Sequence, residues 1–176
     1  MVKVRKMLGS ADSDYIKSLM SLIETQSKET IAEWCLNYSE NVILPIFNKY
    51  CPNDVRVKNA LDASRDWFDG KKKLAEVKDI ILNQCHQAAR ELDDNPAAQA
   101  AARCCGQAAA VFHTPTHSLG LAFYGCAALA YDELGIDKSK EEYDKYAAQQ
   151  CKKMEDALAK IAVKDEKNPA KIKWYC

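Results

Sequence analysis

The stretch that decides the fold is residues 95–135, NPAAQAAARCCGQAAAVFHTPTHSLGLAFYGCAALAYDELG. An Asn-Pro pair opens it, and a Thr-Pro pair at 114–115 repeats this order of a capping residue followed by a first-turn proline. Eight alanines lie between positions 97 and 110, and alanine has the highest helix propensity. The stretch predicts a hairpin of two closely packed helices, one from Pro96 to near His113 and one from Pro115 to Leu134.

Charge is absent from most of this hairpin, because residues 104–131 contain no Lys, Arg, Asp or Glu. A membrane-spanning helix needs about 20 continuous apolar residues. Here Gly106, Gln107 and the polar run 113–118 interrupt the apolar arms. We therefore expect a hairpin buried within the protein, and no membrane partner.

The rest of the chain also favours helix, because glycine and proline are scarce. Ser13 or Asp12 is expected to cap the first helix, and Pro45 to kink or break the second near Leu44, since proline removes a backbone hydrogen bond. We predict an all-α, single-domain bundle of about six to seven helices around the central small-residue hairpin. Five further helices are expected. The first carries Ile16 to Ile23, the second begins at Ser27, the third covers about 55–68, the fourth covers about 74–92, and the last runs from Ser139 to about Val163.

The helix expected over 74–92 shows the clearest periodicity. Its apolar residues recur at three- and four-residue steps, which predicts a stripe that faces the core. The residues of this stripe are Leu74, Val77, Ile81, Cys85, Ala88 and Leu92.

Length and charge limit the classes of protein. A chain of 176 residues suits one domain. The 25 basic and 25 acidic side chains give no net charge, so no overall field attracts nucleic acid. The first thirty residues contain no apolar run of signal-peptide length. We expect a single cytoplasmic domain over residues 1–176, with a loosely ordered tail over 164–176 and no nucleic-acid partner.

The eight cysteines contain no C-x-x-C pair, so neither a zinc knuckle nor a thioredoxin-type motif is present. Thiols of a chain that is not exported stay reduced. We interpret most of these cysteines as small buried apolar residues.

The three histidines and one arginine are the candidate site residues. His113 and His117 would lie one turn apart on a continuous helix, with His86 as a third ligand of a metal site, but Pro115 places the pair across a helix junction. Arg90, one turn after His86, can present its guanidinium to a carboxylate or phosphate, or pair with a nearby acid. A metal site, a polar ligand or partner contact, and a structural role for the histidines remain alternatives.

An ordered series of motifs resembles a known family. It contains L-P-x-F at 44–47, D-x-R-x-x-x-A-L-x-A-x-R-x-W at 54–67, H-x-A-A-R at 86–90, and A-A-R-x-x-G-x-A-A-A-x-x-H-x-x-x-H at 101–117. Together these segments resemble the immunity-protein-five-like domain of bacterial polymorphic toxin systems over about residues 35–131. Gln107 stands where the pattern has a histidine, and Cys104 and Cys105 stand where it has alanines.

The resemblance implies an all-helical protein that binds and neutralises a cognate toxin. Our leading hypothesis is therefore an immunity protein that acts without catalysis and without a cofactor or metal, with His86, Arg90, His113 and His117 as candidate binding residues. A small-molecule- or metal-binding helical protein, or an enzyme, that uses the three histidines is the alternative. A homodimer formed through the last helix is a third hypothesis.

Overall fold

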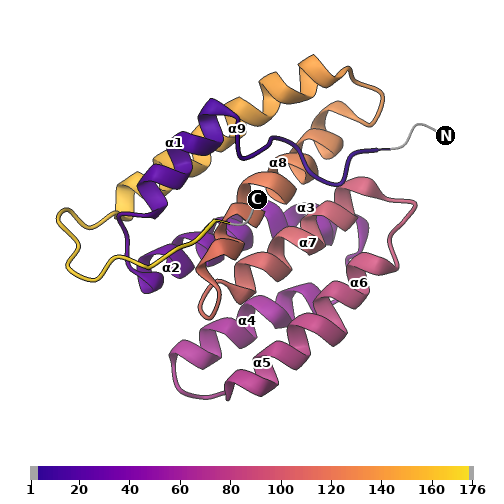
Figure 1. Ribbon diagram of the computed structural model, residues 1–176. Coiled ribbons are helices and arrows are strands. Elements are labelled where there is room, and N and C mark those ends of the chain that lie inside the picture. The colour runs from indigo at the N-terminus through magenta and orange to yellow at the C-terminus, as the bar shows by residue number, and fades with distance from the viewer. Residues whose placement is uncertain (1–3, 175–176) are drawn as a thin grey trace.

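A computed structural model of the chain describes residues 4–174, and this range contains only helices, turns and irregular segments (Figure 1). Nine α-helices are joined by two π-helical turns, η1 and η2, and one 3-10 turn, η3. Because each π turn continues the helices on either side of it, the described residues form seven continuous helical rods. The bounds are α1 Asp14–Ile23, α2 Lys28–Tyr38, η1 Ser39–Ile43, α3 Leu44–Tyr50, α4 Arg56–Phe68, α5 Leu74–Ile80, η2 Ile81–Cys85, α6 His86–Arg90, α7 Pro96–Ala110, η3 Pro115–Ser118, α8 Leu119–Leu134 and α9 Lys140–Ile161. The predicted all-α bundle is confirmed.

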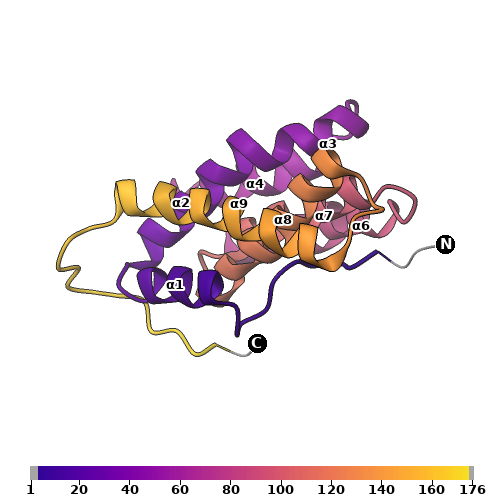
Figure 2. The same ribbon diagram turned by 90° about the horizontal axis from the view of Figure 1, so that it is seen from above.

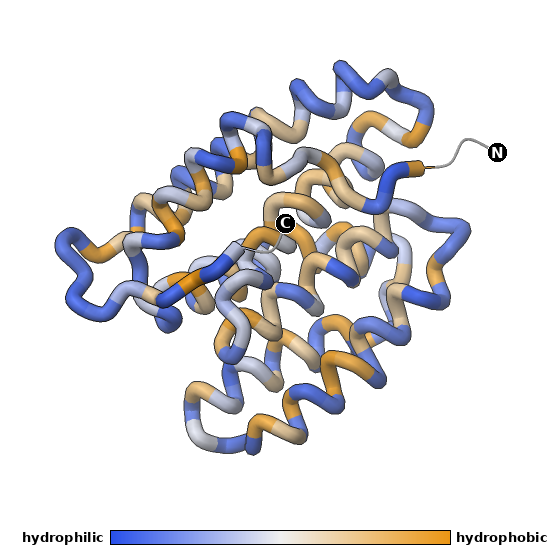
Figure 3. Tube along the Cα trace, viewed as in Figure 1, coloured by the Kyte–Doolittle hydropathy of each residue, from blue (hydrophilic) through white to orange (hydrophobic). Residues whose placement is uncertain are grey.

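The hairpin of α7 and α8 lies at the centre of the bundle. On one side α9 packs against α8 and carries α1 on its flank, and on the other side α4 and α6 pack against α7 (Figure 1). The rod formed by α2, η1 and α3 contacts both helices of the hairpin (Figure 2). All eight alanines of α7 are buried. Hydrophobic residues accordingly concentrate on the inner helices, and hydrophilic residues on the outer ones (Figure 3).

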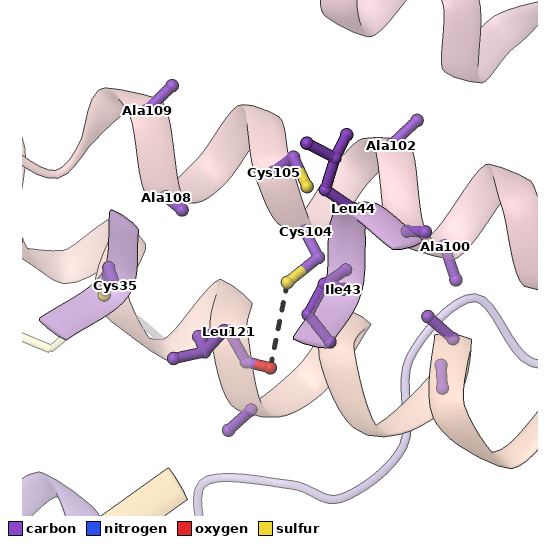
Figure 4. Close-up of a cluster of buried hydrophobic side chains, with 14 of the residues drawn as sticks. Cys35, Ile43, Leu44, Ala100, Ala102, Cys104, Cys105, Ala108, Ala109 and Leu121 are labelled. Atoms are coloured by element: carbon purple, nitrogen blue, oxygen red, sulfur yellow. Dashed lines mark hydrogen bonds between the residues drawn. The ribbon is translucent and has the colours of Figure 1, made fainter. Parts of the chain in front are cut away.

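The backbones of α7 and α8 approach each other closely at Gly120. A Cβ atom added there would lie 2.4 Å from Cβ of Gln107, which is far below a van der Waals contact. One turn away, the Cys104 thiol donates to the carbonyl oxygen of Leu121 at 4.0 Å, within a cluster of buried hydrophobic side chains (Figure 4). The predicted close packing is therefore confirmed, and it depends on a glycine at position 120.

Capping explains where several helices begin. The side chain of Asn95 accepts a hydrogen bond from Ala98 N at 3.0 Å, and Ser27 accepts from Thr30 N at 3.2 Å, as predicted. Ser139 forms a capping box with Glu142, the residue at the third position of α9. The side chain of Ser13, in contrast, makes no capping bond to α1.

Pro45 does not end its helix, because α2, η1 and α3 follow one another without a break. The π turn η1 precedes the proline, and the amide of Leu44 donates to the carbonyl of Ser39, five residues back. In this wider turn a backbone hydrogen bond spans five residues and not four. The change falls just before Pro45, the residue that has no amide hydrogen to donate. The rod from α2 to α3 therefore passes through Pro45.

The predicted apolar stripe over residues 74–92 faces the core except at its first residue. Val77, Ile81, Cys85 and Ala88 are buried as expected, but Leu74 is 39% exposed, so its assignment to the core was wrong. Leu74 is the first residue of α5, at the edge of the bundle, where fewer neighbours cover it.

The segment that follows α9 has no helix or strand in its described part, and it returns to the turn between α1 and α2. Val163 N donates to the side chain of Gln26 at 2.7 Å, and Ala170 N donates to the backbone carbonyl of Gln26 at 2.8 Å. The indole of Trp174 donates to Glu24. No helix within residues 4–174 is both long enough and apolar enough to span a bilayer.

We expect Gly120→Ala to lower the free energy of unfolding by about 1–3 kcal/mol, the usual cost of overpacking. The new methyl group meets Cβ of Gln107, which cannot rotate away because it is fixed to the α7 backbone. Urea denaturation followed by circular dichroism measures the change.

The double variant Gly120→Ala/Gln107→Gly is the matched control, because it moves the missing Cβ to the other helix. It should be less destabilised than the sum of the two single variants. Additive effects would show that the two positions do not limit the approach of α7 and α8.

Candidate functional site

The candidate site lies where α6 runs antiparallel to α7. Gln99 Nε2 in α7 donates to the carbonyl of Ala89 at 2.9 Å, and about one turn further along α7 the Cys85 thiol reaches Ala102 O at 3.3 Å. Since the rod of α5, η2 and α6 follows α7 in this way, residues far apart in the sequence become neighbours across the two helices.

His86 is placed by a glycine of α7. A Cβ atom at Gly106 would lie 2.7 Å from Cε1 and 3.1 Å from Nδ1 of the His86 ring. The amide of His86 donates to Ile81 O, which closes the π turn η2 and makes His86 the first residue of α6. The imidazole therefore lies directly on the backbone of α7, and any side chain at position 106 would displace it.

His113 and His117 lie at the tip of the hairpin, on either side of Pro115. Their ring centroids are 6.2 Å apart. Nδ1 of His113 shares a hydrogen bond of 2.6 Å with Oγ1 of Thr114, so this threonine bonds the histidine and does not cap η3. Nδ1 of His117 is buried and has no hydrogen-bond partner among residues 4–174.

Burial lowers the pKa of all three histidines below its usual value of about 6.5. For His86 the neighbouring charges of Arg90, His117 and Arg103 lower the pKa further. For His113 the added causes are the charges of Lys78 and His117. At neutral pH the three rings are therefore uncharged hydrogen-bonding groups.

Arg90 ends α6 at the surface. Its Nη2 donates to Gln87 Oε1 at 2.8 Å and to the carbonyl of Leu82 at 3.4 Å. No carboxylate in the described range pairs with it, so the surface ion pair that the sequence left open for Arg90 is not formed there.

The structure brings the predicted residues together as a chain of neighbours and not around one point. Arg90 lies near His86, His86 near His117, and His117 near His113. Within residues 4–174 no three side chains of the His, Cys, Asp or Glu type are arranged to hold a metal ion. The arrangement offers hydrogen bonds and positive charge to a ligand.

The cysteines near this site are poor nucleophiles. Burial raises the pKa of the Cys85 thiol to about 12, and burial raises the pKa values of Cys104 and Cys105 as well. A thiol with such a pKa stays protonated at neutral pH. Six of the seven described cysteines are buried and all seven are free, which confirms their interpretation as small apolar residues.

Two residues of the site were not singled out as site residues from the sequence. Arg103 of α7 flanks His86, and Gly106 places it. One signal could have identified Arg103, because it is the only Lys, Arg, Asp or Glu between Asn95 and Tyr131. Gly106 carried no comparable signal, since its role depends on how α6 packs on α7.

Comparison with known families gives one match. A family model described as Imm-5 like putative immunity protein matches residues 21–157. The matched range begins inside α1, ends inside α9, and contains the entire hairpin and all the residues of the site. It is longer than the range of about 35–131 over which the motifs were recognised. No curated protein and no solved structure matches the chain.

We expect the stability of the protein to fall as the pH drops below about 6.5, in part because of His86. Its pKa is lowered in the folded chain, so the unfolded chain binds a proton more readily, and acid favours unfolding. His86→Gln should lose less stability than the wild type between about pH 7.5 and pH 5.5, as measured by urea denaturation.

His113, His117 and every carboxylate are present in both proteins, so the difference between the two pH dependences isolates His86. Parallel pH dependences would contradict a lowered pKa at His86.

Proposed function

Since the chain belongs to the Imm-5 like putative immunity protein family, we propose that it is an immunity protein that binds and neutralises a cognate protein toxin. The family match, which extends from α1 to α9, is the observation that carries this proposal. In this function the protein acts in the cytoplasm of the cell that makes the toxin or of its kin, as part of a polymorphic toxin system.

The proposed mechanism is steric and needs no reaction. The buried thiols with raised pKa values do not supply a nucleophile. The hairpin is held by close backbone contact and by a fully buried alanine face, so it forms a rigid support. A protein with such a support can present one surface to a toxin and block its active site or its assembly with little reorganisation.

The site contributes what a protein interface uses. Arginines and partly buried imidazoles at a surface form directed hydrogen bonds with a partner, and arginine is enriched among residues that dominate binding energy. We propose that the surface around His86 and Arg90 forms part of the contact with the toxin.

Co-expression with the protein encoded beside this chain's gene tests the proposed function. We expect the chain to restore growth of cells that produce that protein, and the purified pair to form a complex of defined stoichiometry in size-exclusion chromatography with light scattering. The same measurement on the chain alone determines whether it is a homodimer.

The control is Ala109→Asp, which places a charge at a fully buried position of α7 and should prevent folding. This variant is expected to give neither rescue nor complex. If the wild-type chain also gives neither, the proposed function is wrong.

A further inference from the structure

The arginines of the described chain divide into two groups. Arg5, Arg56 and Arg65 each pair with at least one carboxylate, whereas Arg90 and Arg103 pair with none within residues 4–174. The pairs formed are Arg5 with Asp144 at 3.7 Å, Arg56 with Asp54 and Glu91 at 2.7 Å each, and Arg65 with Glu40 at 2.6 Å and Glu33 at 3.2 Å.

The two arginines without an ion pair lie on the same part of the surface. Arg90 lies one turn after His86 on α6, and Arg103 lies one turn before Gly106, the residue of α7 on which the His86 ring packs. Both positive charges lower the pKa of His86. The acid next in sequence to Arg90 is Glu91, and its carboxylate is already bound by Arg56 at 2.7 Å and by Gln87 at 2.8 Å. Neither arginine therefore forms an ion pair with a described acid, and the other acid at this contact, Asp93, accepts a hydrogen bond from Gln99 at 2.9 Å.

Arg103 stands out on the hairpin. It is the only charged residue from Asn95 to Tyr131, and its side chain is half-buried. A charged group that is partly removed from water and lacks a counter-ion is costly to the folded chain. Binding of an anion to this guanidinium would offset that cost.

An exposed apolar residue and an unpartnered imidazole nitrogen lie near Arg90 and His86. Leu82 is 56% exposed, and its carbonyl accepts the bond from Arg90. The buried Nδ1 of His117 lacks a partner among the described residues. An exposed leucine beside arginines is the combination that recurs where one protein segment anchors on another.

We propose that the arginine face, defined as Leu82, His86, Arg90, Arg103 and His117, binds an acidic segment of the toxin, whose carboxylates pair with Arg90 and Arg103. This inference rests on the proposed function and specifies the chemistry of its partner. Guanidinium groups form strong, charge-assisted hydrogen bonds with carboxylates. Nε and Nη2 of Arg90 are held by Gln87 and by the Leu82 carbonyl, so Nη1 remains to donate to a partner's carboxylate.

The geometry favours a protein segment over nucleic acid. A nucleic-acid strand presents regularly spaced phosphates, and proteins that bind it line up many basic side chains. Here the face has only two arginines, one on α6 and one on α7, and Glu91, the acid next to Arg90, is already paired with Arg56. The face therefore suits one or two carboxylates next to an apolar side chain.

The test compares two double variants of the full chain that change the net charge equally. Arg90→Gln/Arg103→Gln removes the charge of the arginine face, and Arg5→Gln/Lys152→Gln removes two positive charges that are ion-paired elsewhere. Isothermal titration calorimetry with the protein encoded beside the gene should show binding at least about 30-fold weaker for the first variant, as for the loss of one hot-spot residue. The second variant should bind as tightly as the wild type.

A second measurement uses defined probes and does not depend on the toxin. Decaglutamate, a ten-nucleotide thymidine oligonucleotide and inorganic phosphate are added separately to the ¹⁵N-labelled chain. Decaglutamate should shift the arginine Nε resonances of the wild type and of the Arg5/Lys152 variant, but leave the Arg90/Arg103 variant unchanged.

The outcomes separate the two proposals. Tight toxin binding that survives Arg90→Gln/Arg103→Gln overturns the arginine face and leaves the proposed function intact. If no toxin binds, the proposed function fails, and the decaglutamate shifts decide the chemistry of the face. Shifts with the oligonucleotide or phosphate but not with decaglutamate overturn the inference, and identical thermal unfolding of the variants excludes misfolding as the cause.

Discussion

The close approach of α7 and α8 at Gly120 is the contact on which the rest of the bundle depends. Two helix backbones can come this near only where one side chain is missing and its neighbours are small, as the buried alanines of α7 are. Dense packing of this kind transmits small changes in volume, because the surrounding core has no free space to absorb them. The hairpin thereby fixes the surfaces against which α4, α6 and α9 pack, and it sets the position of every residue of the site.

The same principle places His86 at a second contact. Gly106 lets the rod of α5, η2 and α6 approach α7, and the π turn η2 allows the Cys85 thiol and the His86 ring both to contact α7. A regular helix would separate adjacent side chains by about 100°, whereas a π turn redirects one of them, which is why such turns recur at functional positions. The packing of the core and the geometry of the site are thus set by the same pair of glycines.

Local signals in the sequence predicted most of the fold. Caps at Asn95, Ser27 and Ser139 and the apolar periodicity were sufficient for the helices, because these features act within one or two turns. The π turns were not predictable in this way, and the first of them explains how the helix passes through Pro45. The exposure of Leu74 follows from its place at the first residue of α5, at the edge of the bundle. Nor did sequence spacing reveal that His86 neighbours His117, since that proximity arises from the packing of separate rods on the hairpin.

Arg103 is the position where local and global requirements disagree. The helix around Arg103 consists of alanines, cysteines, glycine and glutamine, which suit a buried hairpin. The half-buried guanidinium of Arg103 makes no ion pair within the described chain, and its charge lowers the pKa of the neighbouring His86. In natural proteins such conflicts concentrate at functional sites, where a group that destabilises the free chain is stabilised in the complex. A glutamine already stands one turn away at position 107, so an uncharged polar residue of similar length would keep the helix without the unpaired charge. The unpaired charge of Arg103 has a physical reason if a carboxylate of a partner forms an ion pair with it in the complex.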